Sequence, residues 1–399
     1  MRKTLIKVID FFIRAILILI PLDKKLIILE GNKNYDDNTR ALFEFMLRAR
    51  VNKSFKFVWF VDNPQNYRYL ESIENVKIKK IAKFFDIIKN PKVFLEFLYY
   101  NSAAGLCIFS NSLFGYNVHK NQRRIYLGHG LGFKNVRGKM GSSSGYKVII
   151  SMSSLHNKLF TKVWPDCADK LIITGYPRND FLFKTPDSVK EYFKHYTKMK
   201  KIIWMPTFKR GLGGKRNDFM CERDCDIGLI SEDFIKNINK VLEENNCLLV
   251  IKLHPFQDLN YVQCFNKCNI ITLSREDIEK IGCATYEFVS IFDAMITDFS
   301  SAVYDYLLLD KPVAFDLSDI EAYKNGIGFL VENVEYYMPG EKIYCANDFI
   351  RFIKNVCLGN DSYADERRKI RDIMHHYKDN NSSERVYKTV ARFFHALEK

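Results

Sequence analysis

Short apolar runs alternate with polar turns and helix-forming stretches along most of the chain. The runs are rich in Val, Ile and Phe and end at turn residues, which is typical of buried parallel strands. The first series lies at residues 25–30, 55–61, 77–81, 105–110, 124–127, 148–151 and 170–174. The second lies at residues 201–205, 248–253, 269–273, 294–297 and 313–315. Helical patterns between the runs predict an α/β fold with doubly wound parallel sheets.

Two such series in one chain predict two Rossmann-like domains that face a central cleft. We place the boundary near Gly175, at a polar turn that follows the last run of the first series. This gives an N-terminal domain at residues 23–175 and a C-terminal domain at residues 176–370. Residues 1–22 and 371–399 are expected to form flanking helical segments.

Residues 3–20 predict an amphipathic helix that Pro21 ends. Lys3, Lys7, Asp10 and Arg14 are spaced by four, three and four residues, which places them on one helical face. The other face is Leu, Ile, Val and Phe. The charged stripe argues against a spanning helix, and no small-residue cleavage site follows. We expect an in-plane anchor on a membrane surface; the alternative is a helix packed on the body of the protein.

The turn Asp298-Phe299-Ser300-Ser301 lies between an apolar strand and a helix expected at residues 302–309. Short oxygen-bearing side chains cap helix N-termini, where free N–H groups and the helix dipole attract anions. The turn therefore predicts a phosphate site, although an ordinary capped helix would have the same sequence. Lys311-Pro312 ends the helix.

Other polar groups follow the strands at the edge where ligands bind in open α/β sheets. His129 stands between two glycines and can serve as a general base, because the pKa of a histidine lies near working pH. His254 precedes a proline at a strand end, and protonated it could neutralise a phosphate. Lys252 and Lys209 could do the same. The alternatives are histidines that only cap strands and cations that are solvated surface.

Three further interpretations concern single side chains. Asn38 or Thr39 is expected to cap the helix at residues 40–50. His375 and His376 are expected on a helix surface. Two CxxxC pairs, at Cys221 and Cys264, lack the tighter spacing of zinc sites, so no metal site is expected.

Lys and Arg number 61 against 47 Asp and Glu, a net charge of +14. This surplus indicates an anionic partner, and the lack of a nucleic-acid motif favours phosphates or an anionic membrane surface over nucleic acid. Ten scattered cysteines suggest a reducing, cytoplasmic environment. No GxxxxGK[ST], strand-linked GxGxxG or GxSxG motif occurs, which argues against a P-loop, NAD binding and a serine hydrolase elbow.

Several strand-end motifs together resemble the CDP-glycerol:poly(glycerophosphate) glycerophosphotransferase family, which primes and polymerises teichoic acids. HGLGFK at residues 129–134 is similar to that family's HGTPLK. GYPRND at residues 175–180 matches the family's GYPRND block. PTFK at residues 206–209 resembles PTFR, and KLHP at residues 252–255 resembles the block with the second histidine. TDFSSAVYDYLLLDKP at residues 297–312 resembles TDYSSxxFDxxxxxKP, the most specific block. The departures are Leu131-Gly132 for Thr-Pro and Lys209 for Arg.

The resemblance implies a GT-B fold with an N-terminal acceptor domain and a C-terminal donor domain, bound to the cytoplasmic face of the bacterial membrane. It implies transfer of glycerol or ribitol phosphate from a CDP-polyol to a hydroxyl of a lipid-linked or polysaccharide acceptor, with release of CMP and without a cofactor or metal. His129 would be the general base and His254 would stabilise the phosphates. The implied donor-binding residues are Thr207, Lys209, Lys252, Asp298, Ser300, Ser301 and Asp305, and the acceptor or cleft residues are Lys134, Arg178 and Asn179.

Two other functions fit the same pattern. A GT-B glycosyltransferase that uses a nucleotide sugar for surface polysaccharide would need the same cleft. A non-catalytic protein could bind anionic polymers through its basic face, although two histidines and a serine pair at strand ends argue against it. The motifs do not identify the polyol, the acceptor, the number of units transferred or the oligomeric state.

Overall fold

The computed structural model describes residues 13–31, 34–82, 86–111, 119–206, 232–252 and 266–398. Of the predicted site residues, Thr207, Lys209 and His254 lie outside these ranges. So do most of the predicted N-terminal helix and the cysteines Cys221, Cys225 and Cys264.

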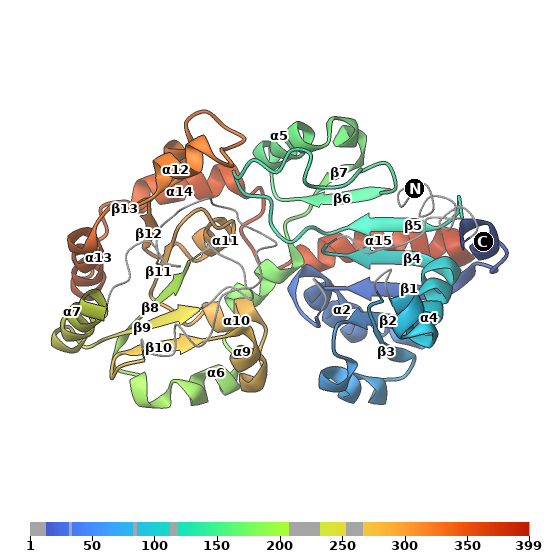
Figure 1. Ribbon diagram of the computed structural model, residues 1–399, viewed down its shortest axis with the longest axis horizontal. Helices are drawn as coiled ribbons and strands as arrows, with labels where there is room; N and C mark the ends of the chain where they lie inside the picture. The colour runs from blue at the N-terminus through green and yellow to red at the C-terminus, as the bar shows by residue number, and fades with distance from the viewer. Residues whose placement is uncertain are drawn as a thin grey trace.

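Seven parallel strands form the sheet of the N-terminal half (Figure 1), in the order β3-β2-β1-β4-β5-β6-β7. The strand order reverses between β1 and β4. In open parallel sheets, ligands bind beyond the carboxyl ends of the strands at such a reversal. The strands are β1 (Asp23–Glu30), β2 (Lys56–Val61), β3 (Val76–Lys80), β4 (Ala104–Phe109), β5 (Arg123–Tyr126), β6 (Val148–Ser151) and β7 (Leu171–Ile173).

Six parallel strands form the sheet of the C-terminal half, in the order β10-β9-β8-β11-β12-β13. Here the reversal lies between β8 and β11, directly before the predicted serine turn. The strands are β8 (Lys200–Met205), β9 (Cys247–Lys252), β10 (Ile270–Leu273), β11 (Ala294–Thr297), β12 (Val313–Asp316) and β13 (Glu341–Ile343). The expectation of two parallel Rossmann-like sheets is confirmed, and β13 is an additional strand.

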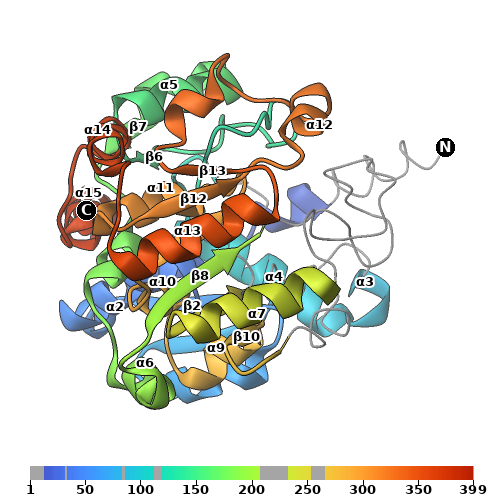
Figure 2. The ribbon, with the colours of Figure 1, turned by 90° about the vertical axis from the view of Figure 1, so that its left-hand side faces the viewer.

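Both faces of the second sheet are covered because its strands are apolar on both sides. Ile202 and Trp204 of β8 pack with one core cluster, and Ile203 between them packs with the other. This is the alternation that a strand buried on two faces requires. Helices α7 (Glu232–Glu244) and α13 (Ala346–Leu358) lie over the Trp204 face, where Figure 2 shows them in front of β8.

The remaining helices connect the strands or cover the sheets. The C-terminal helix α15 returns to the N-terminal half, where it packs against α2 and η4. Backbone N–H groups of Ser382 and Ser383 donate to the Asp180 carboxylate, at 2.9 and 2.7 Å, which fixes the start of α15 to the GYPRND segment. These helices are α2 (Asp37–Arg48), η2 (Pro64–Ser72), α3 (Asp86–Lys89), α4 (Pro91–Ala103), α5 (Ser154–Val163), η4 (Pro177–Phe183), α6 (Asp187–Tyr192), α9 (Arg275–Ile281), α10 (Thr285–Val289), α11 (Ala302–Tyr306), α12 (Ile320–Asn325), α14 (Ala364–Met374) and α15 (Ser382–Glu398).

Two predictions for polar side chains are wrong. Asn38 and Thr39 lie inside the first turn of α2 and are fully buried, so neither caps it. Thr39 Oγ1 donates to the Glu30 carbonyl, which ties α2 to β1. His375 follows α14 and is buried, with its Nε2 2.7 Å from the Tyr304 carbonyl. It is buried because α14 packs against α5 and against the 3-10 turn at Leu307–Leu309. His376 is exposed.

Residues 13–17 are helical and precede the turn that leads into β1. Leu17 packs into the core, whereas Ile16, Ile18 and Leu19 are 64%, 57% and 80% exposed. Within the described ranges, the structure contains no helix with the length and apolar character needed to cross a membrane.

Candidate active site

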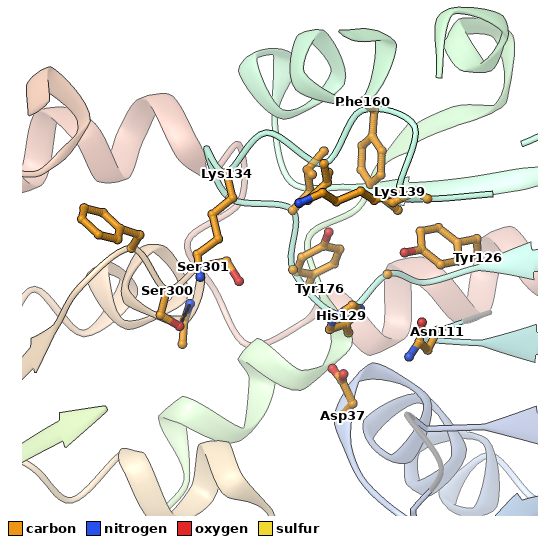
Figure 3. Close-up of a pocket in the computed structure, with 18 of the residues that line it drawn as sticks. Asp37, Asn111, Tyr126, His129, Lys134, Lys139, Phe160, Tyr176, Ser300 and Ser301 are labelled. Carbon is orange, nitrogen blue, oxygen red and sulfur yellow. Dashed lines mark hydrogen bonds between the residues drawn. The ribbon is translucent and has the colours of Figure 1, made fainter. Parts of the chain in front are cut away.

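A cavity of about 580 Å³ lies between the two halves, beyond the carboxyl ends of both sheets (Figure 3). Its size is that of an ordinary small-molecule site. Five of the predicted site residues line it: His129, Lys134, Arg178, Ser300 and Ser301. The part formed by Ser300, Ser301 and Lys134 is called the serine end below.

The HGLG loop brings His129 to the centre of the cavity wall. This loop, residues 129–132, follows β5 after Leu127 and Gly128, and Gly128 and Gly130 have φ of +71° and +109°. Such angles strain any residue with a side chain. The loop can therefore fold back at the strand end while the His129 side chain remains exposed to the cavity.

The HGLG loop packs directly against the serine turn. A Cβ placed on Gly130 would lie 2.6 Å from Ser301 Oγ, and one on Gly132 would lie 3.1 Å from Ser301 Cβ. Side chains at these positions would push the two motifs apart. The two glycines thus permit a close approach between segments that are far apart in the sequence.

The serine turn differs from the predicted helix cap. Helix α11 has only five residues and continues as a 3-10 turn at Leu307–Leu309. Ser301 is the N-cap and makes no capping hydrogen bond with its side chain. Instead, the Ala302 N–H donates to Ser300 Oγ at 3.4 Å. The Ser301 hydroxyl is thus directed to the HGLG loop and the cavity rather than to its own helix (Figure 3).

Arg178 of the GYPRND segment joins the two halves beneath the cavity. Its Nη1 donates to Asp37 Oδ1 at 2.8 Å and to the His129 carbonyl at 2.7 Å, and its Nη2 donates to Asp305 Oδ2 at 2.6 Å. Burial lowers the pKa of Arg178, but the nearby Tyr286, Asp305 and Asp37 together raise it well above its usual range. Tyr286 and Asn179 complete the shell of Asp305, donating at 2.6 and 3.2 Å.

Asn38 and Asp37 fix the same region from the start of α2. The Asn38 amide donates to the Gly128 carbonyl at 2.7 Å and its oxygen accepts from the Arg178 N–H at 3.0 Å. Asp37 has a φ of +66°, a strained value for a residue with a side chain. This backbone places its carboxylate in the cavity wall near His129 (Figure 3).

His156 supports the HGLG loop from behind and takes no part in the cavity wall. Its Nδ1 accepts from the Met152 N–H and its Nε2 lies 3.2 Å from the Leu131 carbonyl, to which it can donate. Burial lowers the pKa of His156 to about 3. The ring is therefore neutral at working pH, which is the form that both hydrogen bonds require.

Four other predicted site residues that the structure describes are buried and do not line the cavity: Asn179, Lys252, Asp298 and Asp305. Asp305 binds Arg178, so its visible role is to hold the site together. Burial, followed by the nearby charge of Arg275, lowers the pKa of Lys252 to about 8. Among the described residues, no group of three or more His, Cys, Asp or Glu side chains could hold a metal ion.

A model of the CDP-Glycerol:Poly(glycerophosphate) glycerophosphotransferase family matches residues 12–392. The chain belongs to this family. The match includes both sheets and the residues that line the cavity between them.

Relatives with known names are distant in sequence. The chain is 23% identical over 339 residues to a teichoic acid poly(glycerol phosphate) polymerase of Staphylococcus epidermidis, covering 78% of this chain and 42% of that protein. A polymerase of the same name from Bacillus spizizenii is 22% identical, with 85% of each chain covered. The teichoic acid ribitol-phosphate polymerase TarL of Staphylococcus aureus is 24% identical, over 68% of this chain and 48% of that protein. The chain thus spans less than half of two of these relatives.

Solved structures show the same architecture. The wall teichoic acid polymerase TagF superimposes with a TM-score of 0.75 at 19% identity, covering 100% of this chain and 98% of that chain. A variant of TagF soaked with CDPG gives a TM-score of 0.74 at 18% identity. MnaA of S. aureus with UDP gives 0.57 at 12% identity and covers 94% and 97% of the two chains. The fold is therefore GT-B-like.

Sequence reasoning missed four members of the candidate site and its supports: Asp37, Asn38, His156 and Tyr176. Asn38 contacts a residue 90 positions away and Asp37 one 141 positions away, so no local motif contains these contacts. Tyr176 lies inside the GYPRND block, and its ring packs 5.2 Å from the Arg178 guanidinium. Of the four, Tyr176 alone stands in a recognisable motif, two residues before Arg178.

Proposed function

We propose that the protein moves glycerol or ribitol phosphate from a CDP-polyol to a hydroxyl of a lipid-linked or polysaccharide acceptor and releases CMP. The observation that carries this proposal is the direct packing of the His129 loop on Ser301 within one cavity. A proton acceptor and a phosphate-binding turn are then close enough to act on one phosphoryl group. Family membership supports the donor class.

In the proposed step, His129 takes the proton of the acceptor hydroxyl. The acceptor oxygen forms a bond to the phosphorus that carries the polyol, and the bond from that phosphorus to CMP breaks. The leaving phosphate takes the electron pair. Ser300 and Ser301, with His254, Lys209 and Thr207, would stabilise the charge on the diphosphate, and Lys252 and Asp298 would support this end from behind.

Lys134 and Arg178 are proposed as acceptor or cleft residues, and both line the cavity. Lys134 lines the cavity beside Ser301, with its ammonium 5.7 Å from the Tyr323 ring centre. Arg178 holds the His129 carbonyl and so orients the base rather than the acceptor. We also propose that residues 23–175 form an acceptor domain and residues 176–370 a donor domain, with residues 371–399 as the C-terminal helix that joins them.

The N-terminal segment is proposed to dock on the anionic, cytoplasmic face of the bacterial membrane. Exposure of Ile16, Ile18 and Leu19 supports this, since these three large apolar side chains are not buried by any part of the chain that the structure describes. Deletion of residues 1–22 should move the protein off liposomes that contain anionic lipid. Unchanged partitioning would contradict the anchor.

Nucleotide release tests the proposed reaction. The full chain is incubated with CDP-glycerol, CDP-ribitol or UDP-sugars, each with a lipid-linked acceptor. CMP release from a CDP-polyol is the expected result, and the preferred CDP-polyol identifies the transferred group. Release of UDP alone would instead support a GT-B glycosyltransferase. No release with any donor would favour a binding protein.

A further inference from the structure

The cavity extends beyond His129, away from the serine end. This far lobe is formed by Asp37, Tyr126, Lys139, Met140, Tyr146 and Trp164. In Figure 3, Tyr126 lies across His129 and Tyr176 from Ser300 and Ser301, and the Lys139 side chain runs above Tyr176. A group that occupies the far lobe would thus approach His129 from the side opposite the proposed diphosphate.

Aromatic rings give the far lobe rigid, flat walls. Tyr126 and Tyr146 are stacked, with ring centres 5.2 Å apart and an interplanar angle of 10°. Trp164 meets both rings edge-on, at 5.5 and 5.7 Å. The Trp164 indole N–H donates to the Gly141 carbonyl, which fixes the segment that carries Lys139 and Met140. These contacts hold the walls in place without a ligand.

The charged side chains in the far lobe are few, and their charges nearly cancel. Among the described lining residues, Asp37 supplies one negative charge and Lys139 one positive charge. Arg178 at its edge is already paired with two carboxylates. Asp37 Oδ1 accepts from Arg178 and from the Asn38 N–H, whereas no hydrogen bond to Oδ2 is found within the described residues.

We propose that the far lobe binds a neutral sugar ring at the end of the acceptor. The apolar C–H face of a pyranose can pack on the half-buried Tyr146, while its hydroxyls can donate to Asp37 Oδ2. An acceptor that ends in polyol phosphate would instead place a phosphate where Lys139 is the one cation among the described far-lobe residues, although phosphates bind best to several donors at short range. The proposal rests on the proposed function and names its acceptor class as a glycan end.

A binding measurement tests the far lobe without turnover. Saturation-transfer NMR is recorded on the full chain with a free N-acetylhexosamine disaccharide and, separately, with glycerophosphoglycerol. We expect saturation of the disaccharide at least fivefold above that of glycerophosphoglycerol. An equal or stronger signal from glycerophosphoglycerol would overturn the proposal.

Two variants locate the binding. Tyr146→Ala removes the wall, and Met140→Trp fills the lobe from its half-buried rim in case the first variant folds poorly. Each folded variant should reduce the disaccharide signal at least fivefold. Tyr344→Ala is the matched control, because Tyr344 is exposed and lies outside the cavity. A signal that survives in both cavity variants would place the sugar elsewhere.

Failure of the proposed function and failure of this inference have different signatures. Absence of CMP release from any CDP-polyol, with disaccharide binding that depends on Tyr146, would reject the reaction and leave the sugar site. CMP release that is at least tenfold more efficient with a polyol-phosphate-ended acceptor than with a glycan-ended one would keep the reaction and reject the sugar site.

Discussion

The serine end and the far lobe lie in the same cavity but are assembled differently. Ser300 and Ser301 come from one turn after β11, and the loop they touch is one short segment after β5. The far lobe draws Asp37, Tyr146 and Trp164 from separate segments of the N-terminal half. The serine end offers hydroxyls and a nearby lysine, whereas the far lobe offers mainly aromatic rings, with one carboxylate and one lysine.

This difference suggests a division of labour. Backbone turns and small side chains allow a close approach to phosphates, whose oxygens need several donors at short range. Flat apolar walls with few polar groups suit a ring with hydroxyls at its edge. His129 lies at the junction, so it should affect chemistry while leaving both ends able to bind.

His129→Ala is expected to have the largest effect on turnover. Loss of a general base should lower kcat about 10³-fold, within the range such groups contribute. Donor affinity and disaccharide binding should stay within threefold, because both ends remain. His195→Ala is the control, since His195 is exposed on η5 (Lys194–Tyr196). A kcat within threefold of the parent would remove His129 as the base.

Arg178→Ala should disturb both ends together. It leaves Asp37 and Asp305 without their cation, and removing one partner of a buried ion pair costs about 3–5 kcal/mol of unfolding free energy. Urea denaturation measures this loss. Arg68→Ala, at an exposed site, should cost less than about 0.5 kcal/mol. If both variants are equally stable, the ion pairs are not what joins the two halves.

Gly130→Ala separates the ends, because its new methyl group would lie 2.6 Å from Ser301 Oγ and 2.8 Å from Arg178 Nη2. We expect about a 100-fold drop in kcat/KM for the donor, an order of magnitude typical of a displaced catalytic loop. Gly138→Ala is the matched control, because it has a φ of +69° but no atom within 4 Å of the added Cβ. Equal losses would show that backbone strain, not the Ser301 contact, causes the effect.

The way the two ends are built also explains what the sequence could predict. His129, Lys134, Ser300 and Ser301 stand in short motifs directly after strands, and strand ends of a parallel sheet meet at one edge. Local pattern therefore predicted that they share a site. The sheets were equally accessible to prediction, because nearly every strand is a continuous apolar run. β13 has only three residues, with burial limited to its end, and gives no such run.

The far lobe and the supports of the site had no local signal. Asn38 looks like a helix cap in sequence, yet it is buried because α2 packs on the loops after β5 and β7. His156 lies on α5, and only the fold reveals that it reaches the Leu131 carbonyl. His375 was wrongly expected at a surface, because its burial too depends on contacts that only the fold creates. These roles depend on tertiary contacts that residue spacing does not encode.

The titration of Lys252 should have the smallest effect on turnover. It tests whether a cation that does not line the cavity still acts on the donor. Because the pKa of Lys252 is lowered to about 8, its charge is present below pH 8 and is lost as pH rises through that value. If the cation supports the diphosphate, the donor KM should rise up to about tenfold between pH 7 and 9, the fraction of charge lost over that interval. Disaccharide binding in the far lobe should not change over the same range. Lys252→Arg keeps its charge at pH 9 and should flatten the rise in KM, since arginine does not titrate there. A KM that rises equally in both proteins would assign the titration to another group and confine the donor contacts to the cavity wall.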